Sequence, residues 1–448
     1  MTTLRARLVV PQGRWQLCAR LPCGASDSDW GADSLTAVLA LRWHATHAPA
    51  LRAYARALER GAPAYRVCRG RGCTGWSDVP LWDAVSAMRR YGVTDEPLAL
   101  AHARAAYASV ARTDLYARGA CPEIDYQRPF GGGGGLKTLE TDANRVLAAA
   151  LLARRTGDAA YLADARRHYA AIRHWFFDRR AGLYTVYVFD DGHACRPLRH
   201  RFFASVNGIM IDAGRALAHL TGDLGYARDA RDTARATAQL DDARGIFVDL
   251  QAGNDVVEPL VRALAGLADA GDGWSRRWLI RNALAAAHAR GADGEYDRFF
   301  DGPPPAGPVT AWQTSGGLAL AVAAGALAPA VRVTPDSAWR RARPHPVAID
   351  HVPATLRFSG SGIALLGAIG ERCCEAGRAR VAIDGRPTFD ATGIWQNKSS
   401  AGRTLPHSVL FAWRWPRAGQ HVLRFEPGTP NAKEGGAFLH VTEAWIVP

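Results

Sequence analysis

Apolar side chains recur at intervals of three and four residues through most of the first 330 positions of the chain. This spacing gives each segment one apolar face, which predicts amphipathic helices that pack together. Two clear apolar stripes are Val206, Ile209, Met210, Ala213, Leu217 and Leu220, and Tyr161, Leu162, Ala165, Tyr169, Ile172 and Phe176. The predicted helices are 33–60, with a break at Pro49, and 79–91, 97–111, 140–155, 158–177, 205–220, 223–239, 254–270, 273–290 and 309–327.

The tripeptide Thr-Gly-Asp joins consecutive predicted helices at Thr156-Gly157-Asp158 and again at Thr221-Gly222-Asp223. Weaker copies are found at Val93-Thr94-Asp95 and at Ala270-Gly271-Asp272. Glycine ends one helix in the left-handed conformation, and aspartate accepts the free backbone amides of the next. So short a connection makes the two helices antiparallel, and copies roughly 60 residues apart indicate a series of helical hairpins. We therefore predict a mainly α fold, an (α/α)6 toroid, over residues 1–330.

The pattern changes after this region to an alternation of apolar and polar residues. Residues 331–346 carry several Pro and Arg residues and are expected to form a linker. In 380–385 the alternating side chains run into an Asp-Gly turn, which is typical of a β-hairpin. Similar short alternations, separated by glycines, predict a β-sandwich over residues 347–448.

The composition is that of an ordered globular protein, with 48% hydrophobic residues and a formal net charge of +13. The arginines are spread along the chain, so the charge is read as a compositional bias, with an anionic glycan as the alternative. No basic run interleaved with aromatic residues and no known nucleic-acid motif is found, so nucleic acid is not an expected partner. No apolar stretch is long enough to cross a membrane or to act as a secretion signal. We expect a cytoplasmic protein, with export left open if the start is misassigned.

The eight cysteines give no single indication. The pairs Cys18/Cys23 and Cys68/Cys73 have a spacing that a zinc site tolerates, but the surrounding turn pattern is missing. Cys121, Cys195 and Cys373-Cys374 have no such partners in the sequence. We interpret the cysteines as buried free thiols, with disulfides and a metal site as alternatives, and expect no metal.

The long loops before alternate helices are rich in aromatic residues, glycine and aspartate. In a helical toroid such loops line one end of the ring, and sugars bind to aromatic faces and to Asp, Asn and Gln side chains. We therefore expect a poly- or oligosaccharide as the partner. The candidate binding residues in and beside these loops are Trp76, Tyr126, Asp191, Asn207 and Trp312. The five glycines at 131–135 lack the Gly-Lys-Ser/Thr ending of a nucleotide-binding loop, so no cofactor is expected.

Several segments together resemble one enzyme family. They are Trp76–Trp82, the glycine-rich loop, Arg155–Leu162, Ser205–Met210 and Arg244–Val248, in this order along the chain. Over about residues 30–327 the chain resembles the family 76 glycoside hydrolases, (α/α)6 enzymes that act as endo-α-1,6-mannanases. The resemblance implies that a pair of adjacent aspartates supplies the nucleophile and the acid/base at the helix start occupied here by Ser77–Val79.

Only Asp78 of this implied pair is present, since Ser77 or Val79 stands at the other position. Hydrolysis of a glycosidic bond needs two carboxyl groups, about 5 Å apart in retaining enzymes and further apart in inverting ones. We predict Asp142 as the second catalytic residue, and the other candidate partners are Glu140, Asp125, Asp190 and Asp191. The structural alternatives are helix capping for Asp78 and Asp142, a structural amide for Asn207 and a turn for Asp190 and Asp191.

The C-terminal region resembles accessory β-sandwich domains of carbohydrate-active enzymes. Trp395 lies in a polar segment and is a candidate sugar-binding residue, while Trp413 and Trp415 share one face of a predicted strand. The leading hypothesis for the whole chain is a glycoside hydrolase that acts on an α-linked polysaccharide such as mannan. One alternative is a glycan-binding protein without activity. The other is a polysaccharide lyase, for which the candidate residues are Tyr126, Tyr184, His193, His200 and Asn207.

Overall fold

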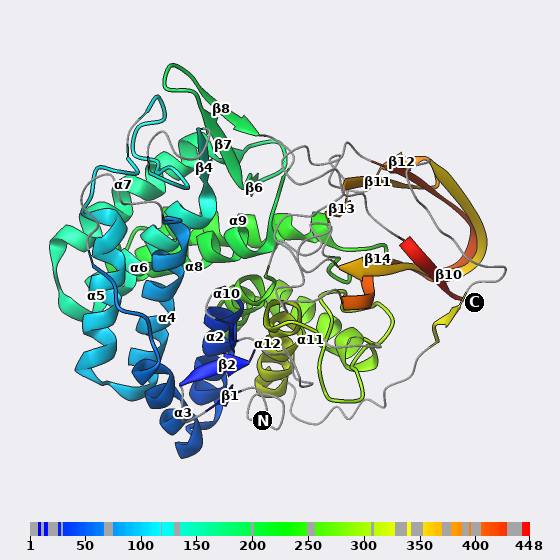
Figure 1. The fold of residues 1–448 in the computed structure, drawn as a ribbon, viewed down its shortest axis with the longest axis horizontal. Coiled ribbons are helices and arrows are strands. Elements are labelled where there is room, and N and C mark those ends of the chain that lie inside the picture. Colours follow the sequence, from blue (N-terminus) through cyan, green and yellow to red (C-terminus); the bar gives the residue numbers. More distant parts are fainter. Residues whose placement is uncertain are drawn as a thin grey trace.

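A computed structural model shows a helical body joined to a β-sheet (Figure 1). It describes residues 8–9, 13–16, 26–27, 30–66, 75–117, 119–129, 135–198, 201–248, 256–305, 309–327, 338–341, 353–369, 378–387, 394–395, 405–427 and 441–448. Within these residues no helix has the length and apolar character needed to cross a membrane.

Six helices form a closed inner ring. They are α2 (Trp30–Thr46), α4 (Asp78–Thr94), α6 (Leu139–Thr156), α8 (Ala204–Thr221), α10 (Glu258–Asp269) and α12 (Ala311–Leu327). Each of these helices packs against the next, and α12 packs against α2, which closes the ring. The predicted toroid is therefore confirmed.

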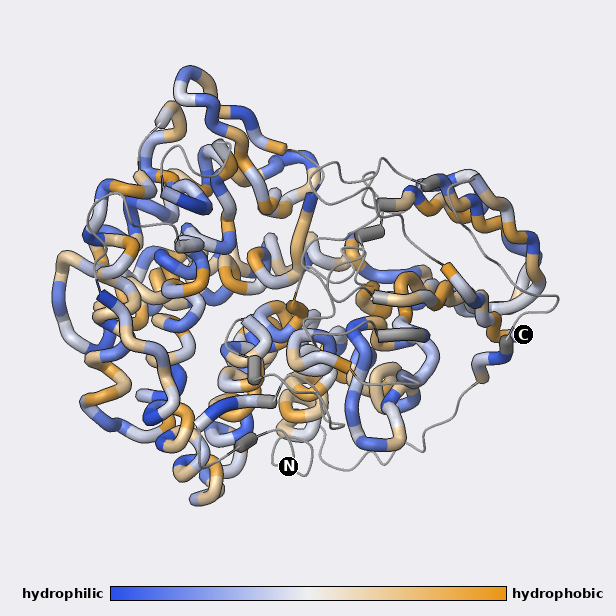
Figure 2. The backbone as a smooth tube through the Cα atoms, viewed as in Figure 1, coloured by the Kyte–Doolittle hydropathy of each residue, from blue (hydrophilic) through white to orange (hydrophobic). Residues whose placement is uncertain are grey.

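Five further described helices lie outside the ring. They are α3 (Pro49–Arg60), α5 (Pro97–Ala111), α7 (Ala159–Trp175), α9 (Leu224–Ala236) and α11 (Gly273–His288). Each connects two inner helices in sequence and returns the chain to the same end of the ring. The inner helices are consequently parallel to one another. Figure 2 shows apolar and polar residues alternating along the helices, as one-sided packing requires.

The predicted break at Pro49 separates α2 from α3. Helix α2 ends at Thr46, and Pro49 occupies the first turn of α3, where its missing amide hydrogen costs no hydrogen bond. Helix α9 ends earlier than predicted, at Ala236, and continues as a short 3-10 helix, Thr237–Leu240. Helix α10 begins at Glu258, whereas 254–255 of the predicted helix lie outside the described residues.

The two Thr-Gly-Asp junctions have the same geometry. Gly157 and Gly222 end their helices with φ of 70° and 73°, and their amides donate to the carbonyls four residues earlier. Asp158 accepts a hydrogen bond from the amide of Ala160 at 2.9 Å, and Asp223 accepts one from the amide of Gly225 at 2.8 Å. The repeated tripeptide therefore encodes a helix stop and a helix start in three residues.

The weaker copies use other residues for the same purpose. At the junction of α4 and α5 the left-handed position is taken by Asp95, with φ of 56°. Asp95 therefore takes the place of the glycine in the motif, and Thr94 takes the place of the threonine. A direct alignment of the tripeptides would instead pair Val93 with the threonine. At the junction of α10 and α11, Gly271 has φ of 92° and Asp272 accepts from the amide of Ser275 at 2.8 Å.

The C-terminal strands form one antiparallel sheet in the part of the chain that the structure describes. The strand order is β12 (Arg386–Pro387), β11 (Arg378–Ile383), β14 (Leu405–Pro427), β10 (Ala354–Ile369), β15 (Val441–Val447) and β9 (Arg340–Arg341), and β13 (Ile394–Trp395) also pairs with β11. The two long strands, β10 and β14, pair over nearly their whole length, with a register shift between Gly360 and Gly362. The all-β character predicted for this region is confirmed, and its strands appear as one bent sheet.

The sheet packs on the helical body. Its apolar cluster includes Val248 and Phe299 from the helical part beside strand residues such as Phe411 and Phe425. Strand β9 pairs with β15, so Arg340 and Arg341, in the predicted linker, belong to the sheet. The predicted division of the chain at residue 330 stays a prediction.

The interpretation of the cysteines as free thiols is wrong for one pair. Cys121 and Cys195 form a disulfide, although 74 positions separate them in the sequence. Cys195 belongs to β8 (Cys195–Leu198), which pairs with β7 (Tyr187–Asp190), and β7 pairs with β4 (Leu136–Thr138). The amide of Cys121 donates to Asp190, the last residue of β7, which places Cys121 beside β8. Sequence spacing missed the bond because it depends on these tertiary contacts. The other six cysteines lie outside the described residues.

Candidate functional site

The starts of the six inner helices gather at one end of the ring, because the inner helices are parallel. Besides Asp33 and Asp142, the described residues in these first turns include three carboxylates and two tryptophans. They are Asp78 of α4, Glu140 of α6, Glu258 of α10, Trp30 of α2 and Trp312 of α12. A ring end of this kind, with acidic and aromatic residues together, is the candidate site.

Asp78 is the first residue of α4 and only 3% exposed. Ser77, which precedes it, does not cap the helix with its side chain. Instead, Ser77 Oγ donates to the carbonyl of Tyr126 at 2.9 Å and lies 2.7 Å from Oγ1 of Thr141. This contact fixes the start of α4 against the start of α6. Asp78 directly follows Ser77 and Glu140 directly precedes Thr141, so both carboxylates come from residues next to this contact.

Glu140 lies in the first turn of α6 and is buried. Its position is fixed by the local sequence, because Thr138 caps the helix by accepting from the amide of Glu140 at 3.3 Å. One turn later, Asn144 donates from Nδ2 to the carbonyl of Glu140, and its Oδ1 has no hydrogen-bond partner in the described part of the chain. A hydroxyl donor placed here would satisfy this buried oxygen.

Glu258 is a carboxylate that sequence reasoning missed. It begins α10, is 1% exposed and accepts from Nε of Arg262 at 2.9 Å. Burial raises the pKa of Glu258 to about 8, although the charge of Arg89 opposes this shift. Arg262 also contacts Asp212, to which Arg89 donates at 3.3 Å. The helix prediction began at 254 and so placed Glu258 inside a helix, although a Glu-Pro pair is itself a helix-start signal.

Aromatic and amide side chains complete this end of the ring. The rings of Trp30 and Trp312 lie 5.3 Å apart, which joins the starts of α2 and α12. Nε1 of Trp30, Nε1 of Trp82 and Nε2 of Gln313 are buried and have no hydrogen-bond partner among the described residues. Buried N–H groups without an acceptor are costly, so a sugar hydroxyl bound at this end of the ring would be a favourable acceptor for these three donors.

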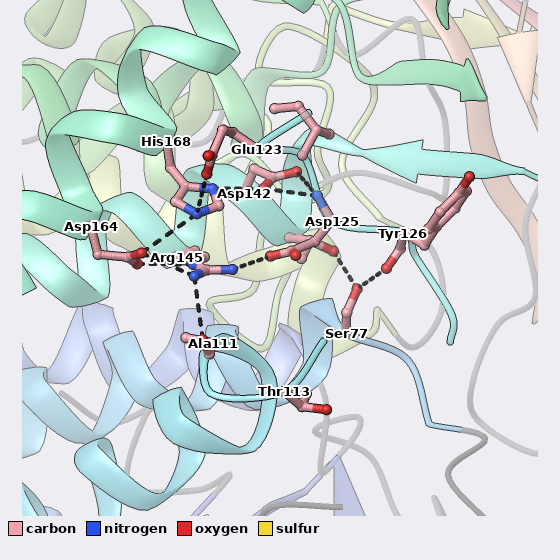
Figure 3. Close-up of polar contacts among 12 residues, drawn as sticks. Ser77, Ala111, Thr113, Glu123, Asp125, Tyr126, Asp142, Arg145, Asp164 and His168 are labelled. Carbon is pink, nitrogen blue, oxygen red and sulfur yellow. Dashed lines mark hydrogen bonds and ion pairs between the residues drawn. The ribbon is translucent and has the colours of Figure 1, made fainter. Parts of the chain in front are cut away.

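Asp142 lies in the same first turn of α6 as Glu140, but its carboxylate contacts the preceding loop and α7; its assignment as a catalytic residue stays a prediction. It is fully buried, and both carboxylate oxygens accept from the amide of Asp125 at 3.2 Å. Its Oδ1 lies 3.4 Å from Nδ1 of His168 on the outer helix α7 (Figure 3). Asp142 follows Glu140 by two positions, which places the two side chains on different faces of α6. Asp142 thus connects α6 to α7.

Trp76 and Tyr126 differ in exposure. Trp76 is 43% exposed, and the guanidinium of Arg128 lies 4.0 Å above its ring, so it remains a candidate platform for a sugar. Tyr126 is buried, with the ammonium of Lys137 4.3 Å from its ring. Burial, together with the charge of Asp190, raises the pKa of Tyr126 to about 12. Tyr126 therefore contacts Lys137, and its assignment as a substrate-binding residue stays a prediction.

Asn207 and Asp191 form hydrogen bonds with the backbone around them, and their assignment as substrate-binding residues stays a prediction. Asn207 is fully buried; its Oδ1 accepts from the amide of Tyr184 at 2.9 Å, and its Nδ2 donates to the carbonyls of Tyr184 and Phe203. Asp191 accepts from the amides of His193 and Ala194 in the turn between β7 and β8. These bonds lower the pKa of Asp191 to about 2.

Two other candidate partner carboxylates are also committed elsewhere. Asp190 accepts from the amides of Ala120, Cys121 and Gly192, and these bonds lower its pKa to about 2 against the effect of burial. Asp125 pairs with Arg145, whose Nη1 lies 2.7 Å from Oδ2. Of the partners considered from the sequence, Glu140 is thus the one next to the contact between Ser77 and Thr141 that joins the starts of α4 and α6.

Some sequence candidates cannot be placed. His200 and residues 130–134, which include most of the glycine run, lie outside the described residues. Trp395 is in β13, but its side chain is outside the description. Trp413 is half-buried, and the ring of Trp415 stacks on that of His421 at 3.8 Å.

Comparisons with known proteins identify the fold through solved structures. No family model matches the sequence, and no curated protein matches it significantly. Solved structures do match. One is an inactive variant of an α-1,6-mannanase of a Salegentibacter species, with two consecutive aspartates replaced by alanine, in complex with α-1,6-mannotetrose. The TM-score is 0.61 at 17% sequence identity, over 73% of this chain and 96% of that chain.

Two further structures support the same fold. A family 76 glycoside hydrolase (mannosidase) of Bacteroides thetaiotaomicron matches with a TM-score of 0.59 at 14% identity, over 73% of this chain and 95% of that chain. Dfg5 of Chaetomium thermophilum, in complex with glucosamine, matches with a TM-score of 0.52 at 15% identity, over 67% of this chain and 81% of that chain. The helical part of this protein therefore has the (α/α)6 fold of the family 76 glycoside hydrolases.

Proposed function

We propose that this protein is a glycoside hydrolase that acts on an α-linked mannan at the end of the ring where the inner helices begin. The fold supports the proposal, because several structures of this fold are mannanases and two of them hold an α-1,6-linked mannose oligosaccharide. The buried Trp and Gln donors at the helix starts suit a ligand rich in hydroxyl groups.

The observation that carries the proposal is the placement of Asp78 and Glu140. They occupy the first turns of neighbouring inner helices, on either side of the 2.7 Å contact between Ser77 and Thr141. Two carboxyl groups held on rigid, adjacent elements are the minimum that glycoside hydrolysis requires. One protonates the leaving oxygen, while the other attacks the anomeric carbon or activates a water molecule. Asp78 with Glu140 replaces the adjacent aspartates that the family resemblance implied.

Glu258 is a second possible partner for Asp78. A general acid must hold a proton at the working pH, and the pKa of Glu258, about 8, meets this condition. It belongs to α10, which does not neighbour α4 in the ring. The pair Asp78 and Glu258 would suit an inverting reaction, which needs the larger separation.

The test is the release of reducing ends from α-1,6-mannan by the wild type and by single variants. We expect the single variant Asp78→Asn to lower kcat by at least a hundredfold. Of the single variants Glu140→Gln and Glu258→Gln, the one that removes the catalytic partner of Asp78 should lower kcat by a similar factor. Asp158→Asn, at the exposed cap of α7, is the matched control and should keep full activity. Equal rates for the wild type and Asp78→Asn would remove Asp78 from the mechanism.

A glycan-binding protein without activity is the second candidate, favoured by the start of α4. The inactive mannanase variant lacks two consecutive aspartates, whereas this chain has a single one, Asp78, flanked by Ser77 and Val79. Ser77 is engaged with Tyr126 and Thr141 and offers no carboxylate. Binding of mannan without product formation by the wild type would select this function.

The disulfide bears on the compartment in which the protein works. Disulfides persist in oxidising environments and are rare where thiols are kept reduced. The bond between Cys121 and Cys195 therefore supports an exported protein over a cytoplasmic one. An endo-acting enzyme of this kind would also meet polysaccharide outside the cell. Fractionation of the producing cells, followed by immunodetection of the chain, tests this proposal.

A further inference from the structure

A second cluster of titratable side chains lies behind the start of α6, between this helix and the outer helix α7. It contains Asp125 from the preceding loop, Asp142 from α6 and His168 from α7. One ligand atom of each residue lies within 4.8 Å of the others, and no other group of this kind occurs among the described residues. The three residues are 1%, 0% and 2% exposed. The cluster is closed to solvent, as structural metal sites are.

Two atoms of this cluster have unused bonding capacity. Oδ1 of Asp125 and Nδ1 of His168 are buried and make no hydrogen bond within the described part of the chain. Arg145 occupies only the other oxygen of Asp125, since its Nη1 lies 2.7 Å from Oδ2. His168 Nδ1 lies 3.4 Å from Oδ1 of Asp142, without hydrogen-bond geometry. Leaving such atoms unpaired in the interior is costly unless something binds them.

The charge of the cluster also points to a missing cation. Asp125 and Asp142 lie beside Asp164, which is held by Arg145 at 2.9 Å. At the rim, Glu123 pairs with Arg167 at 2.6 Å. Four carboxylates therefore face the guanidinium groups of Arg145 and Arg167. They also face the imidazole of His168, whose nitrogens lie 3.4 Å from Asp142, 3.6 Å from Asp164 and 4.0 Å from Glu123; Figure 3 shows Arg145 and His168 among the carboxylates. With a neutral imidazole, the form that binds a metal, two negative charges remain uncompensated, and they match one divalent cation.

We propose that Asp125, Asp142 and His168 bind a divalent transition-metal ion, with Zn²⁺ as the best fit and Mn²⁺ as the alternative. One imidazole nitrogen with two carboxylate oxygens suits these ions, whereas Ca²⁺ and Mg²⁺ prefer oxygen ligands alone. The ion is structural. It joins the loop before Tyr126 to α6 and α7, and so supports the segment against which Ser77 is fixed.

Sequence patterns alone do not predict this site. Asp125, Asp142 and His168 are spread over three elements and do not form a short metal-binding motif. The proposal does not depend on the proposed function, because the ion would be bound whether or not the protein hydrolyses a glycan.

The test measures metal content and thermal stability of the full chain, purified without a histidine tag. The protein is stripped with a chelator and then dialysed against Zn²⁺, Mn²⁺ or Ca²⁺. We expect about one equivalent of Zn²⁺ or Mn²⁺ by mass spectrometry of the metals, and a Tm several degrees above that of the stripped protein. Retention of no metal, with an unchanged Tm, would overturn the proposal, as would a preference for Ca²⁺.

Two variants separate this site from other histidines. His168→Ala should lose the bound metal and the metal-dependent rise in Tm. His102→Ala is the matched control, because His102 is also packed against two carboxylates, Asp83 and Glu59, and a guanidinium lies beside them. It should lose stability but keep its metal. Equal metal content in the wild type and His168→Ala contradicts the proposal.

A spectroscopic measurement on the wild type covers the case in which His168→Ala does not fold. Co²⁺ added to the stripped protein should give a visible absorption band that one equivalent of Zn²⁺ removes. The absence of this band, or its persistence in the presence of Zn²⁺, would contradict the assignment.

Discussion

Burial controls the protonation of two consecutive aspartates outside the inner ring. Asp241 and Asp242 follow the 3-10 helix after α9, where they border a cavity of 320 Å³. Burial raises the pKa of each to about 7. Asp241 accepts from Nε1 of Trp278 at 3.2 Å, and the charges that face the pair are those of Arg281, Arg244 and Asp301. Both carboxyl groups are therefore largely protonated below neutral pH.

This protonation makes the stability of the protein depend on pH. Between about pH 4 and pH 7 the folded protein holds a proton on Asp241 that the unfolded chain has released. The free energy of unfolding therefore falls as the pH rises through this window. Asp241→Asn should reduce the slope by up to about 1.4 kcal/mol per pH unit. Urea unfolding at several pH values checks this, and an unchanged slope would show that Asp241 ionises freely in the folded state.

The orientation of single side chains was the part of the site that sequence reasoning predicted least well. Asp78 was placed correctly at a helix start, since a local pattern marks that position. Asp142 was chosen over Glu140, although both stand in the same first turn. The packing of α7 against α6 decides which of them faces His168, and no local pattern records that contact. Glu258 was missed for the same kind of reason.

At the level of elements, the helix junctions are encoded locally. Gly157 has φ of 70°, and nothing lies within 4 Å of the position that a Cβ atom would take. A side chain at this position therefore causes no clash, and its cost is the strain of the left-handed backbone alone. Gly92, inside α4, likewise has open space around it but lacks the positive φ.

Replacement of these two glycines by alanine should have opposite effects. Gly157→Ala should lower the free energy of unfolding by about 1–2 kcal/mol, because alanine strains the left-handed position. Gly92→Ala should raise it by about 0.5–1 kcal/mol, because alanine favours the helix interior. Chemical denaturation of both variants measures the difference. A loss of stability in both, or in neither, would contradict the capping role of Gly157.

The disulfide connects two elements that sequence patterns did not join. Cys121 belongs to the loop before α6, and Cys195 belongs to β8. The double variant Cys121→Ser/Cys195→Ser should lose about 2–4 kcal/mol, because a long loop of the unfolded chain is no longer closed. Unfolding of the wild type with and without reductant gives the same comparison. Stability that is independent of the bond would show that the strand pairing alone holds this region.

Elements were predicted better than their pairing. The helices agree with the prediction to within a few residues at most ends, because apolar spacing and capping are local signals. The small sheet of β4, β7 and β8 was not predicted. Its strands have only three or four residues each, and a whole helical hairpin, α6 and α7, separates β4 from β7. Such pairing depends on the ring that brings the strands together.

At the scale of the whole molecule, the sheet is connected to the ring by a half-buried ionic group. Asp301 lies between Arg244 of the helical part, at 2.6 Å, and Arg414 of β14, at 3.1 Å. Beside it, Arg298 donates to the carbonyl of Val409 at 3.1 Å. The sheet and the ring therefore share polar contacts as well as an apolar cluster.

Removal of Asp301 should weaken this connection. Asp301→Ala leaves the guanidinium groups of Arg244 and Arg414 without their shared partner, so we expect a loss of about 1.5–3 kcal/mol. Glu426→Ala is the control, because Glu426 pairs with Arg424 at the surface and should contribute less than about 1 kcal/mol. Thermal unfolding measures both, and equal losses would contradict a special role for Asp301.

The most direct test of the account is the binding of α-1,6-mannotetraose to Asp78→Asn, measured by titration calorimetry. This variant should bind the sugar without cleaving it, since the change preserves the shape of the site. Trp312→Ala in the same background should bind at least tenfold more weakly, because it removes the ring that packs on Trp30 at the helix starts. Failure of Asp78→Asn to bind, or equal affinity with and without Trp312, would contradict a glycan site at this end of the ring.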